Sequence, residues 1–156
     1  MKKRGFTLVE IMIVVAIIAL LAAIAIPNLL RARLQANESS AQAALKTVAT
    51  GEITYRSANS SYATLSALGS ATPPYIDSTL GCLAGLLNVA CLKSGYNFYT
   101  TNAGNETFCV TAYPQTINVT GVRPFCITED GVVRTDGAIV ATTTHDVCQT
   151  YGATAP

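Results

Sequence analysis

Glu10 is the only charged side chain between residues 6 and 26, and it stands at the start of a continuous apolar run. From Ile11 to Ile26 no side chain is polar. An acidic residue near the centre of a membrane costs roughly 2.5–3.5 kcal/mol on insertion scales, and somewhat less near the interface. A carboxylate kept in such a segment is therefore expected to have a function, and a buried carboxylate needs a partner.

The cysteines are the second group that can do chemistry, and all of them lie in the second half of the chain: Cys82, Cys91, Cys109, Cys126 and Cys148. They follow a segment that can act as an export signal, so we expect disulfides formed in an oxidising compartment. No Cys-x-x-Cys pair occurs, and the single histidine, His145, is three residues from Cys148, so no zinc site is expected. Five is an odd number, so at least one thiol is free or pairs between chains.

The other residues predict no catalytic site. His145 and Asp146 lie beside Cys148, but neighbours in a short tail rarely adopt the geometry of a cysteine nucleophile and its base, so a solvated histidine is expected. No glycine-rich phosphate loop is present, and we expect no enzyme activity, cofactor or metal. Ten basic and nine acidic residues give no support for nucleic-acid binding.

The apolar run is long enough to act as a membrane anchor. As a helix, residues 6–26 would span about 31 Å, which crosses a bilayer. Three basic residues at positions 2–4 hold the start in the cytoplasm, so the rest of the chain lies outside. A secretory signal peptide cut near residues 23–25, or a plain signal anchor, would explain the apolar run but not Glu10.

The helical pattern continues beyond Pro27, a residue that should kink or locally melt the helix. Apolar side chains then recur at steps of three, four and seven residues, at Leu30, Leu34, Ala41, Leu45, Val48 and Tyr55. Much of the other surface is polar, with Arg31, Arg33, Gln35, Glu38, Gln42 and Lys46. Residues 28–57 are therefore predicted to form an amphipathic helix whose apolar face is covered by the rest of the chain.

The C-terminal part predicts a small antiparallel sheet. Alternating runs at residues 95–100, 107–113, 124–128 and 131–134 are typical of strands, and Asp130-Gly131 predicts a tight turn between the last two. A short helical turn is expected near Tyr62, Leu65 and Leu68. We expect an α+β head in which the aromatic side chains belong to the core, namely Tyr96, Phe98, Tyr99 and Phe108.

Residues 5–10, Gly-Phe-Thr-Leu-Val-Glu, together with Pro27 strongly resemble the processing and assembly motif of type IV pilins and of the pseudopilins of type II secretion. The resemblance is dense over residues 2–36 and covers only the general layout elsewhere. It implies cleavage after Gly5 and methylation of Phe6, the new N-terminus. It also implies that Glu10 guides assembly by pairing with the α-amino group of Phe6 on a neighbouring subunit.

The family layout then divides the chain. Residues 1–5 are the leader, 6–27 the transmembrane and assembly helix, and 28–57 the amphipathic half of the same helix. Residues 58–94 are the αβ-loop and 95–134 the antiparallel sheet. The variable C-terminal tail, 135–156, is small, polar and rich in threonine, so we expect it to be exposed.

Spacing does not fix the disulfide pairing. Cys82 with Cys91 is the first choice, since both lie in one loop, and Cys109 with Cys126 is the second, since their strands could be neighbours; Cys148 would then be free. The rival scheme pairs Cys148 with Cys109 or Cys126 and staples the tail to the sheet, as many pilins do.

The resemblance predicts a type IV pilus subunit, anchored in the inner membrane before assembly and on the cell surface after it. Its implied partners are a peptidase that also methylates, an assembly ATPase, an inner-membrane platform protein and further copies of the chain. A pseudopilin, or a minor pilin in adhesion or DNA uptake, is the alternative. Pseudopilins can carry calcium, but two short turns account for the acids Glu129, Asp130 and Asp136.

Overall fold

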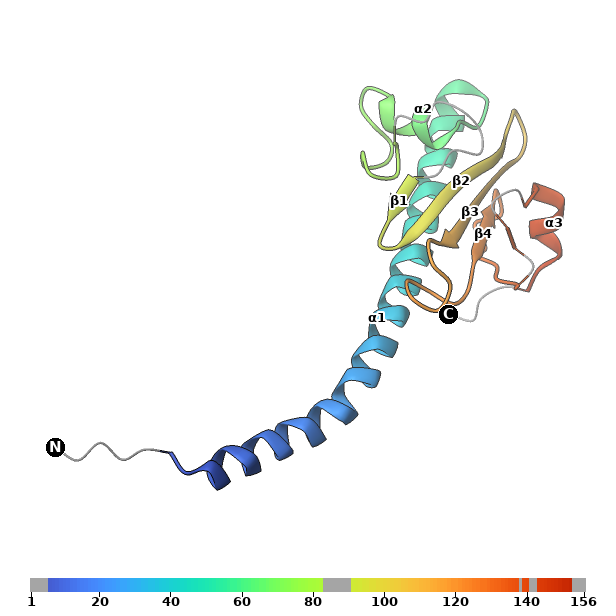
Figure 1. Cartoon of the computed structure of the whole chain (residues 1–156). Coiled ribbons are helices and arrows are strands. Elements are labelled where there is room, and N and C mark those ends of the chain that lie inside the picture. The colour runs from blue at the N-terminus through green and yellow to red at the C-terminus, as the bar shows by residue number, and fades with distance from the viewer. Residues whose placement is uncertain (1–5, 83–90, 138, 141–142, 153–156) are drawn as a thin grey trace. The chain divides into compact units, whose positions relative to one another are not determined.

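The computed structural model describes residues 6–82, 91–137, 139–140 and 143–152, with residue 102 described by its backbone alone (Figure 1). The chain divides into two units, Met1–Arg33 and Leu34–Pro156, which we describe separately. One helix, α1 (Leu8–Asn59), contributes to both units.

In the first unit, α1 begins directly after Thr7 and is continuous through Pro27. The structure therefore gives no sign of local melting at the proline, and a bend there stays a prediction. The predicted helices on either side of Pro27 form a single element, as the continuing apolar pattern indicated.

In the second unit, one face of α1 is buried under the rest of the chain. Ala41, Leu45 and Val48 are fully buried, which confirms the middle of the predicted apolar stripe. Leu34 and Tyr55 are half-buried, and the predicted cover of Leu30 is wrong, since Leu30 is 57% exposed. Ala44 and Ala49 extend this face, and such small side chains leave room for a sheet to approach closely. Glu38, expected on the polar surface, is instead buried, and its partners are described below.

The sheet has four antiparallel strands in the order β1-β2-β3-β4. They are β1 (Cys91–Lys93), β2 (Tyr96–Ala103), β3 (Phe108–Pro114) and β4 (Phe125–Thr128). Figure 1 shows them beside the C-terminal part of α1. This arrangement confirms the α+β, pilin-like fold class.

The aromatic side chains of the sheet fill the core against α1. Tyr96, Phe98, Phe108 and Phe125 are fully buried and belong to the same cluster as Leu45. Burial of one such side chain stabilises a fold by about 1.5–3 kcal/mol. The predicted core aromatics are thus confirmed, except that Tyr99 is only half-buried.

The first hairpin corrects a predicted boundary. Residues 91–93 were placed in the loop, but they form β1 and pair with β2 through Lys93 and Tyr96. The two turn residues between them, Ser94 and Gly95, both have positive φ angles, of 50° and 75°. Two-residue hairpins favour this conformation because its twist matches that of the strands. A three-residue strand with one lysine carries too weak a pattern to be recognised.

The predicted hairpin after β4 forms only in part. Gly131 adopts a positive φ of 72°, and its N–H donates to the Thr128 carbonyl at 3.0 Å. Beyond this turn the chain returns to β4 at a single bridge between Cys126 and Arg134. The prediction of a strand over residues 131–134 is therefore wrong, although Arg134 pairs with β4 as a single bridge.

The loop before the sheet packs tightly around α2 (Leu65–Ser70), which confirms the predicted short helical turn. Thr64 caps α2 by accepting a hydrogen bond from the N–H of Ala67 at 3.3 Å. Gly69 and Gly81 touch backbone to backbone, since a Cβ added to either would lie 2.4 Å from the Cα of the other. Only glycine fits both positions.

The C-terminal segment is packed on the sheet, so its expected exposure is wrong for part of it. A short helix, α3 (His145–Thr150), follows β4, and Ile139, Thr143 and Cys148 are buried. Ile139 and Cys148 form a second small cluster with Cys109 and Cys126. The cause is a disulfide, described below, that the small polar composition of the tail does not reveal.

Candidate assembly site and the clusters of the head

The first turn of α1 brings Thr7 and Glu10 together. The hydroxyl of Thr7 accepts a hydrogen bond from the Glu10 N–H at 3.2 Å, and Oε2 of Glu10 accepts one from the Thr7 N–H at 2.8 Å. The Thr7 hydroxyl also donates to Oε2 at 2.7 Å. This reciprocal pattern is a capping box, which satisfies two backbone donors at a helix start.

The predicted cleavage and methylation residues lie just before this cap. Phe6 is 83% exposed, so nothing in the described chain covers it. Gly5 lies outside the described residues. In the uncut chain the nitrogen of Phe6 is a peptide amide, and only cleavage turns it into a charged amine. The carboxylate of Glu10 would then lie four residues from a new cation.

The apolar half of α1 exposes its side chains all around. Among the described residues, this helix alone is long and apolar enough to cross a membrane; its most apolar window has a mean hydropathy of 3.0 and no buried residue. Its exposed large side chains include Leu8, Val9, Ile11, Met12, Ile13, Val14, Val15, Ile17, Ile18, Leu20, Leu21, Ile24, Ile26, Leu29 and Leu30. Exposed apolar surface on this scale marks a membrane or protein contact.

Glu38 binds the loop between β3 and β4. Its Oε1 accepts the N–H groups of Val122 at 3.0 Å and Arg123 at 3.2 Å. Its Oε2 accepts Nε and an Nη of Arg123 at 3.0 and 2.8 Å, a two-pronged ion pair. Burial raises the pKa of Glu38, but these bonds outweigh it and hold the pKa below its ordinary value.

Glu52 is a buried carboxyl with only half of its oxygens satisfied. It is fully buried, and its Oε2 accepts the N–H of Ala63 at 2.9 Å. Its Oε1 has no hydrogen-bond partner in the part of the chain that the structure describes. Burial raises the pKa of Glu52 to about 7, and the Ala63 N–H offsets only part of that rise. The bond fastens the start of the αβ-loop to α1.

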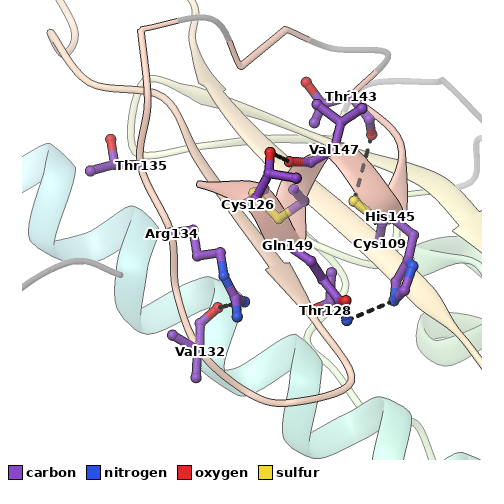
Figure 2. The surroundings of a disulfide bond; sticks show 12 residues. Cys109, Cys126, Thr128, Val132, Arg134, Thr135, Thr143, His145, Val147 and Gln149 are labelled. Carbon is purple, nitrogen blue, oxygen red and sulfur yellow. Dashed lines mark hydrogen bonds between the residues drawn. A yellow bond between two sulfur atoms is a disulfide. The ribbon is translucent and has the colours of Figure 1, made fainter. Parts of the chain in front are cut away.

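Two disulfides staple the head. Cys82–Cys91 confirms the first-choice pair. The second-choice pair, Cys109–Cys126, is wrong: Cys126 bonds to Cys148, the rival scheme in which the tail is stapled to the sheet. Figure 2 shows this disulfide between β4 and α3.

The sheet register explains the second pairing. Cys109 lies opposite Thr128 and Cys126 lies opposite Thr111, so the two cysteines are diagonal neighbours. Such neighbours are about 7–8 Å apart, too far for the Cα atoms of a disulfide at about 4.4–6.8 Å. Cys109 keeps a free, buried thiol, and burial raises its pKa to about 11.

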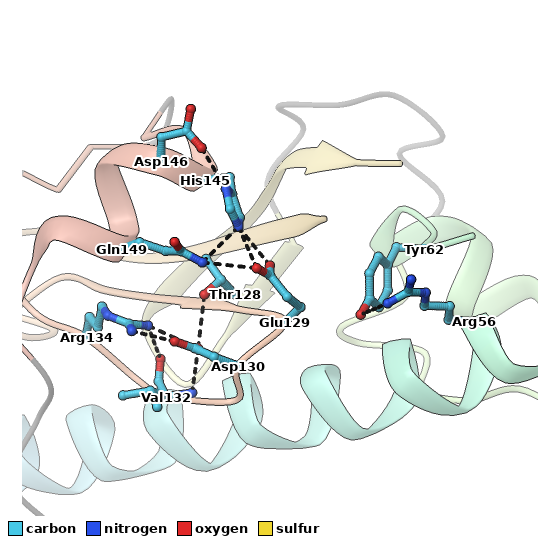
Figure 3. Close-up of polar contacts among 10 residues, drawn as sticks. All are labelled: Arg56, Tyr62, Thr128, Glu129, Asp130, Val132, Arg134, His145, Asp146 and Gln149. Atoms are coloured by element: carbon cyan, nitrogen blue, oxygen red, sulfur yellow. Dashed lines mark hydrogen bonds and ion pairs between the residues drawn. The ribbon is translucent and has the colours of Figure 1, made fainter. Parts of the chain in front are cut away.

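The side chain of His145 is only 13% exposed and is bonded to two carboxylates, so the expectation of a solvated histidine is wrong. Its Nε2 lies 2.8 Å from the carboxylate of Glu129, and its Nδ1 lies 2.8 Å from Asp146 (Figure 3). Gln149 donates to Glu129 at 3.0 Å. Burial lowers the pKa of His145, but the two carboxylates outweigh it and leave the pKa above its ordinary value. The cluster fixes α3 to the end of β4.

The acidic residues of the turn after β4 serve the fold. Asp130 forms an ion pair with Arg134, and its Oδ1 also accepts from Thr128 at 3.0 Å and from the Val132 N–H at 2.9 Å (Figure 3). Glu129 is engaged by His145. These contacts support the interpretation of the acids as turn residues.

Sequence reasoning identified Glu10 but missed its partner and the two buried acids of the head. The Thr-x-x-Glu spacing of residues 7–10 is the signature of a capping box and could have been recognised. Glu38 lies between Leu34 and Ala41, and Glu52 lies between Val48 and Tyr55, at the positions where the apolar stripe skips a three- or four-residue step. The helical spacing could therefore have placed both acids on the covered face of α1. Their partners, Arg123 and Ala63, are set by tertiary packing.

The long apolar-then-amphipathic helix and the four-stranded antiparallel sheet define an α+β protein of pilin-like architecture. Residues 1–26 match the family model described as the prokaryotic N-terminal methylation motif. The chain is similar to the type IV wide pilus major component PilA4 of Thermus thermophilus, with 39% identity over 98 residues, which cover 60% of this chain and 74% of that protein. The chain belongs to the type IV pilin family.

A second relative matches over a shorter stretch. The type IV major pilin protein PilA of Myxococcus xanthus is 46% identical over 61 residues, which cover 39% of this chain and 28% of that protein. Both relatives are structural pilins, which fits a pilin subunit without enzymatic activity.

Proposed function

We propose that this chain is a structural subunit of a type IV pilus, cut after Gly5, methylated on Phe6 and polymerised through residues 6–27. The observation that carries the proposal is the apolar half of α1, exposed throughout and interrupted by a single carboxylate at its first turn. The match to the methylation motif supports the processing step. The named relatives support a pilus over a pseudopilus.

The apolar half of α1 serves two environments in succession. Before assembly it lies in the inner membrane, with the basic residues 2–4 on the cytoplasmic side. After assembly the same side chains pack against those of neighbouring subunits in the filament core. The chain has no nucleotide-binding motif. Extraction from the membrane therefore needs energy from an assembly ATPase acting with an inner-membrane platform protein.

Glu10 sets the register of that packing. In the filament its carboxylate pairs with the α-amino group of Phe6 on a neighbouring subunit. A subunit inserted at the wrong height leaves both charges buried and unpaired. Removal of one partner from a buried ion pair costs about 3–5 kcal/mol, enough to stop assembly.

The test compares Glu10→Ala with Glu106→Ala, which removes an exposed carboxylate from the head. We expect both variants to reach the membrane and to be processed, and only Glu10→Ala to lose sheared surface filaments in electron microscopy. Intact mass should give residues 6–156 with one added methyl group. Normal filament yield from Glu10→Ala would refute the pairing, and an uncut Gly5–Phe6 bond would refute the processing step.

A further inference from the structure

The loop between β3 and β4, residues 115–124, exposes three aliphatic side chains within six residues. Ile117, Val119 and Val122 are 50%, 64% and 48% exposed. Single exposed aliphatic residues are ordinary on a protein surface. Here three of them share one loop, whereas Val147, also exposed, lies on another element, α3.

The loop holds its own shape. The Asn118 N–H donates to the Gly121 carbonyl at 2.8 Å, and the Thr120 N–H donates to the Thr116 carbonyl at 2.9 Å. The Thr120 hydroxyl accepts the Thr116 N–H at 3.0 Å. At Gly121 a Cβ would lie 2.0 Å from the Tyr96 hydroxyl oxygen, so the loop backbone lies directly on the core. The loop thus satisfies several of its backbone polar groups by itself, and three of its aliphatic side chains are left exposed.

Two polar side chains of α1 fasten this loop to the helix. Glu38 accepts four hydrogen bonds from Val122 and Arg123, and Nδ2 of Asn37 donates to the Thr120 carbonyl at 2.8 Å. Burial of a carboxylate is costly unless it is paired. Glu38 is paired with the loop, so its burial holds the loop in a fixed position on α1. A loop that is already ordered loses little conformational entropy when it docks.

The charges of the loop indicate an apolar partner. Residues 115–124 contain one charged side chain, Arg123, whose charge is paired with Glu38. The largest exposed apolar surface of the described chain is residues 6–30, which carry one charge, Glu10. Two surfaces of this kind can be buried against each other without leaving a charge unpaired when Glu10 is paired with the amine of Phe6, as proposed above.

We propose that residues 115–124 of one subunit pack against the apolar segment 6–30 of a neighbouring copy in the filament. The proposal rests on the filament function proposed above and assigns to it a specific contact of the head. The two surfaces differ, so the contact is head-to-tail, the kind that generates an open helical polymer instead of a closed dimer.

Photo-crosslinking in intact filaments tests this contact. p-Benzoylphenylalanine is introduced in place of Val119, or in place of Val147 on α3 as the control, and the dimers formed on irradiation are mapped by mass spectrometry. We expect the probe at position 119 to give dimers whose second peptide lies within residues 6–30, and the probe at 147 to give none of these. Dimers joined through other residues, crosslinks to lipid alone, or no crosslinks would overturn the proposal.

Charge placement gives a second test. Val119→Asp should reduce sheared filament at least ten-fold while processed subunit in the membrane stays at the wild-type amount, and Val147→Asp should change neither. Equal filament yields for the two variants would contradict the contact. Such a result would leave the pilus function intact, because that function is tested by Glu10→Ala.

Discussion

Thr7 and Glu10 bind each other reciprocally at the first turn of α1, each accepting the backbone N–H of the other. The carboxylate proposed to set filament register therefore has a local partner before assembly. Pairing with the amine of a neighbouring Phe6 would exchange these bonds for an ion pair. On the proposed function, Glu10 would thus have hydrogen-bond partners before assembly and an ion-pair partner after it.

Thr7→Ala should loosen the start of α1 without the assembly defect of Glu10→Ala. Loss of an N-cap hydroxyl costs about 1 kcal/mol, and Thr7→Ser keeps the hydroxyl. Hydrogen exchange of the full chain in detergent micelles should show faster exchange for the first-turn amides of Thr7→Ala alone. Equal protection in Thr7→Ala and wild type would show that the capping box does not hold the helix start.

Arg123→Ala should destabilise the head, because it leaves the Glu38 carboxylate buried without its cation. A buried acceptor deprived of its partner costs about 1–3 kcal/mol, and the lower half applies here because Arg123 is itself 57% exposed. The midpoint of urea unfolding of the full chain in micelles measures the loss. Arg31→Ala, an exposed position, should leave the midpoint unchanged.

A double variant tests whether the stability lost in Arg123→Ala comes from the unpaired charge of Glu38 or from lost packing of the Arg123 side chain. Replacing Glu38 by glutamine together with Arg123 by leucine removes the buried charge along with its partner. The glutamine keeps an oxygen that can accept the backbone N–H groups of residues 122 and 123. We expect the double variant to unfold at a higher urea concentration than Arg123→Ala. A double variant no more stable than the single one would contradict the pairing.

Much of the fold followed from pattern. The apolar run and the three-and-four spacing predicted both parts of α1, and alternation predicted β2, β3 and β4. These features depend on residues adjacent in sequence. The short strand β1 and the helix α3 carry no such pattern, because one is held by its neighbour in the sheet and the other by a disulfide.

In the candidate site and the head clusters, the sequence likewise predicted residues that stand out from their neighbours and missed their distant partners. Glu10 stands out because its neighbours are all apolar. The helical spacing places Glu38 on the apolar face of α1, but it says nothing of Arg123, the partner 85 residues later. The pairing of Cys126 with Cys148 depended on the register of β3 and β4, which alternation alone does not fix.

The observed connectivity predicts one reactive thiol, released only on unfolding. Cys109 is fully buried, and burial raises its pKa to about 11, so the native chain should not react with iodoacetamide at neutral pH. After denaturation without a reductant, mass spectrometry should find one alkyl group per chain, on Cys109. Alkylation of Cys148 instead would contradict the Cys126–Cys148 disulfide and would indicate that Cys109 pairs with Cys126.

Cys148→Ser should free α3 from the sheet. The bond joins residues 22 positions apart, and closure of a loop of this size contributes about 3 kcal/mol in the chain-entropy model. The urea midpoint should fall accordingly, and the amides of residues 145–150 should exchange faster. Cys109→Ala, which breaks no disulfide, should leave those amides protected.

Glu52 should make the head less stable as pH rises from about 4.5 to 7. Its pKa is raised from 4.5 to about 7 in the folded chain, so folding favours the protonated form. The stabilisation is complete below the unfolded pKa and is lost as pH rises to the folded one, by on the order of 3 kcal/mol at most.

Glu52→Gln keeps an oxygen that can accept the Ala63 N–H but cannot ionise. The variant should therefore match wild type near pH 4.5 and exceed it in stability at pH 8, as measured by the urea midpoints of the two chains. The pKa of His145 is also raised above its ordinary value, but His145 is present in both chains, so its contribution cancels in the difference. Parallel pH curves for the two chains would show that Glu52 ionises as freely in the folded head as in the unfolded chain.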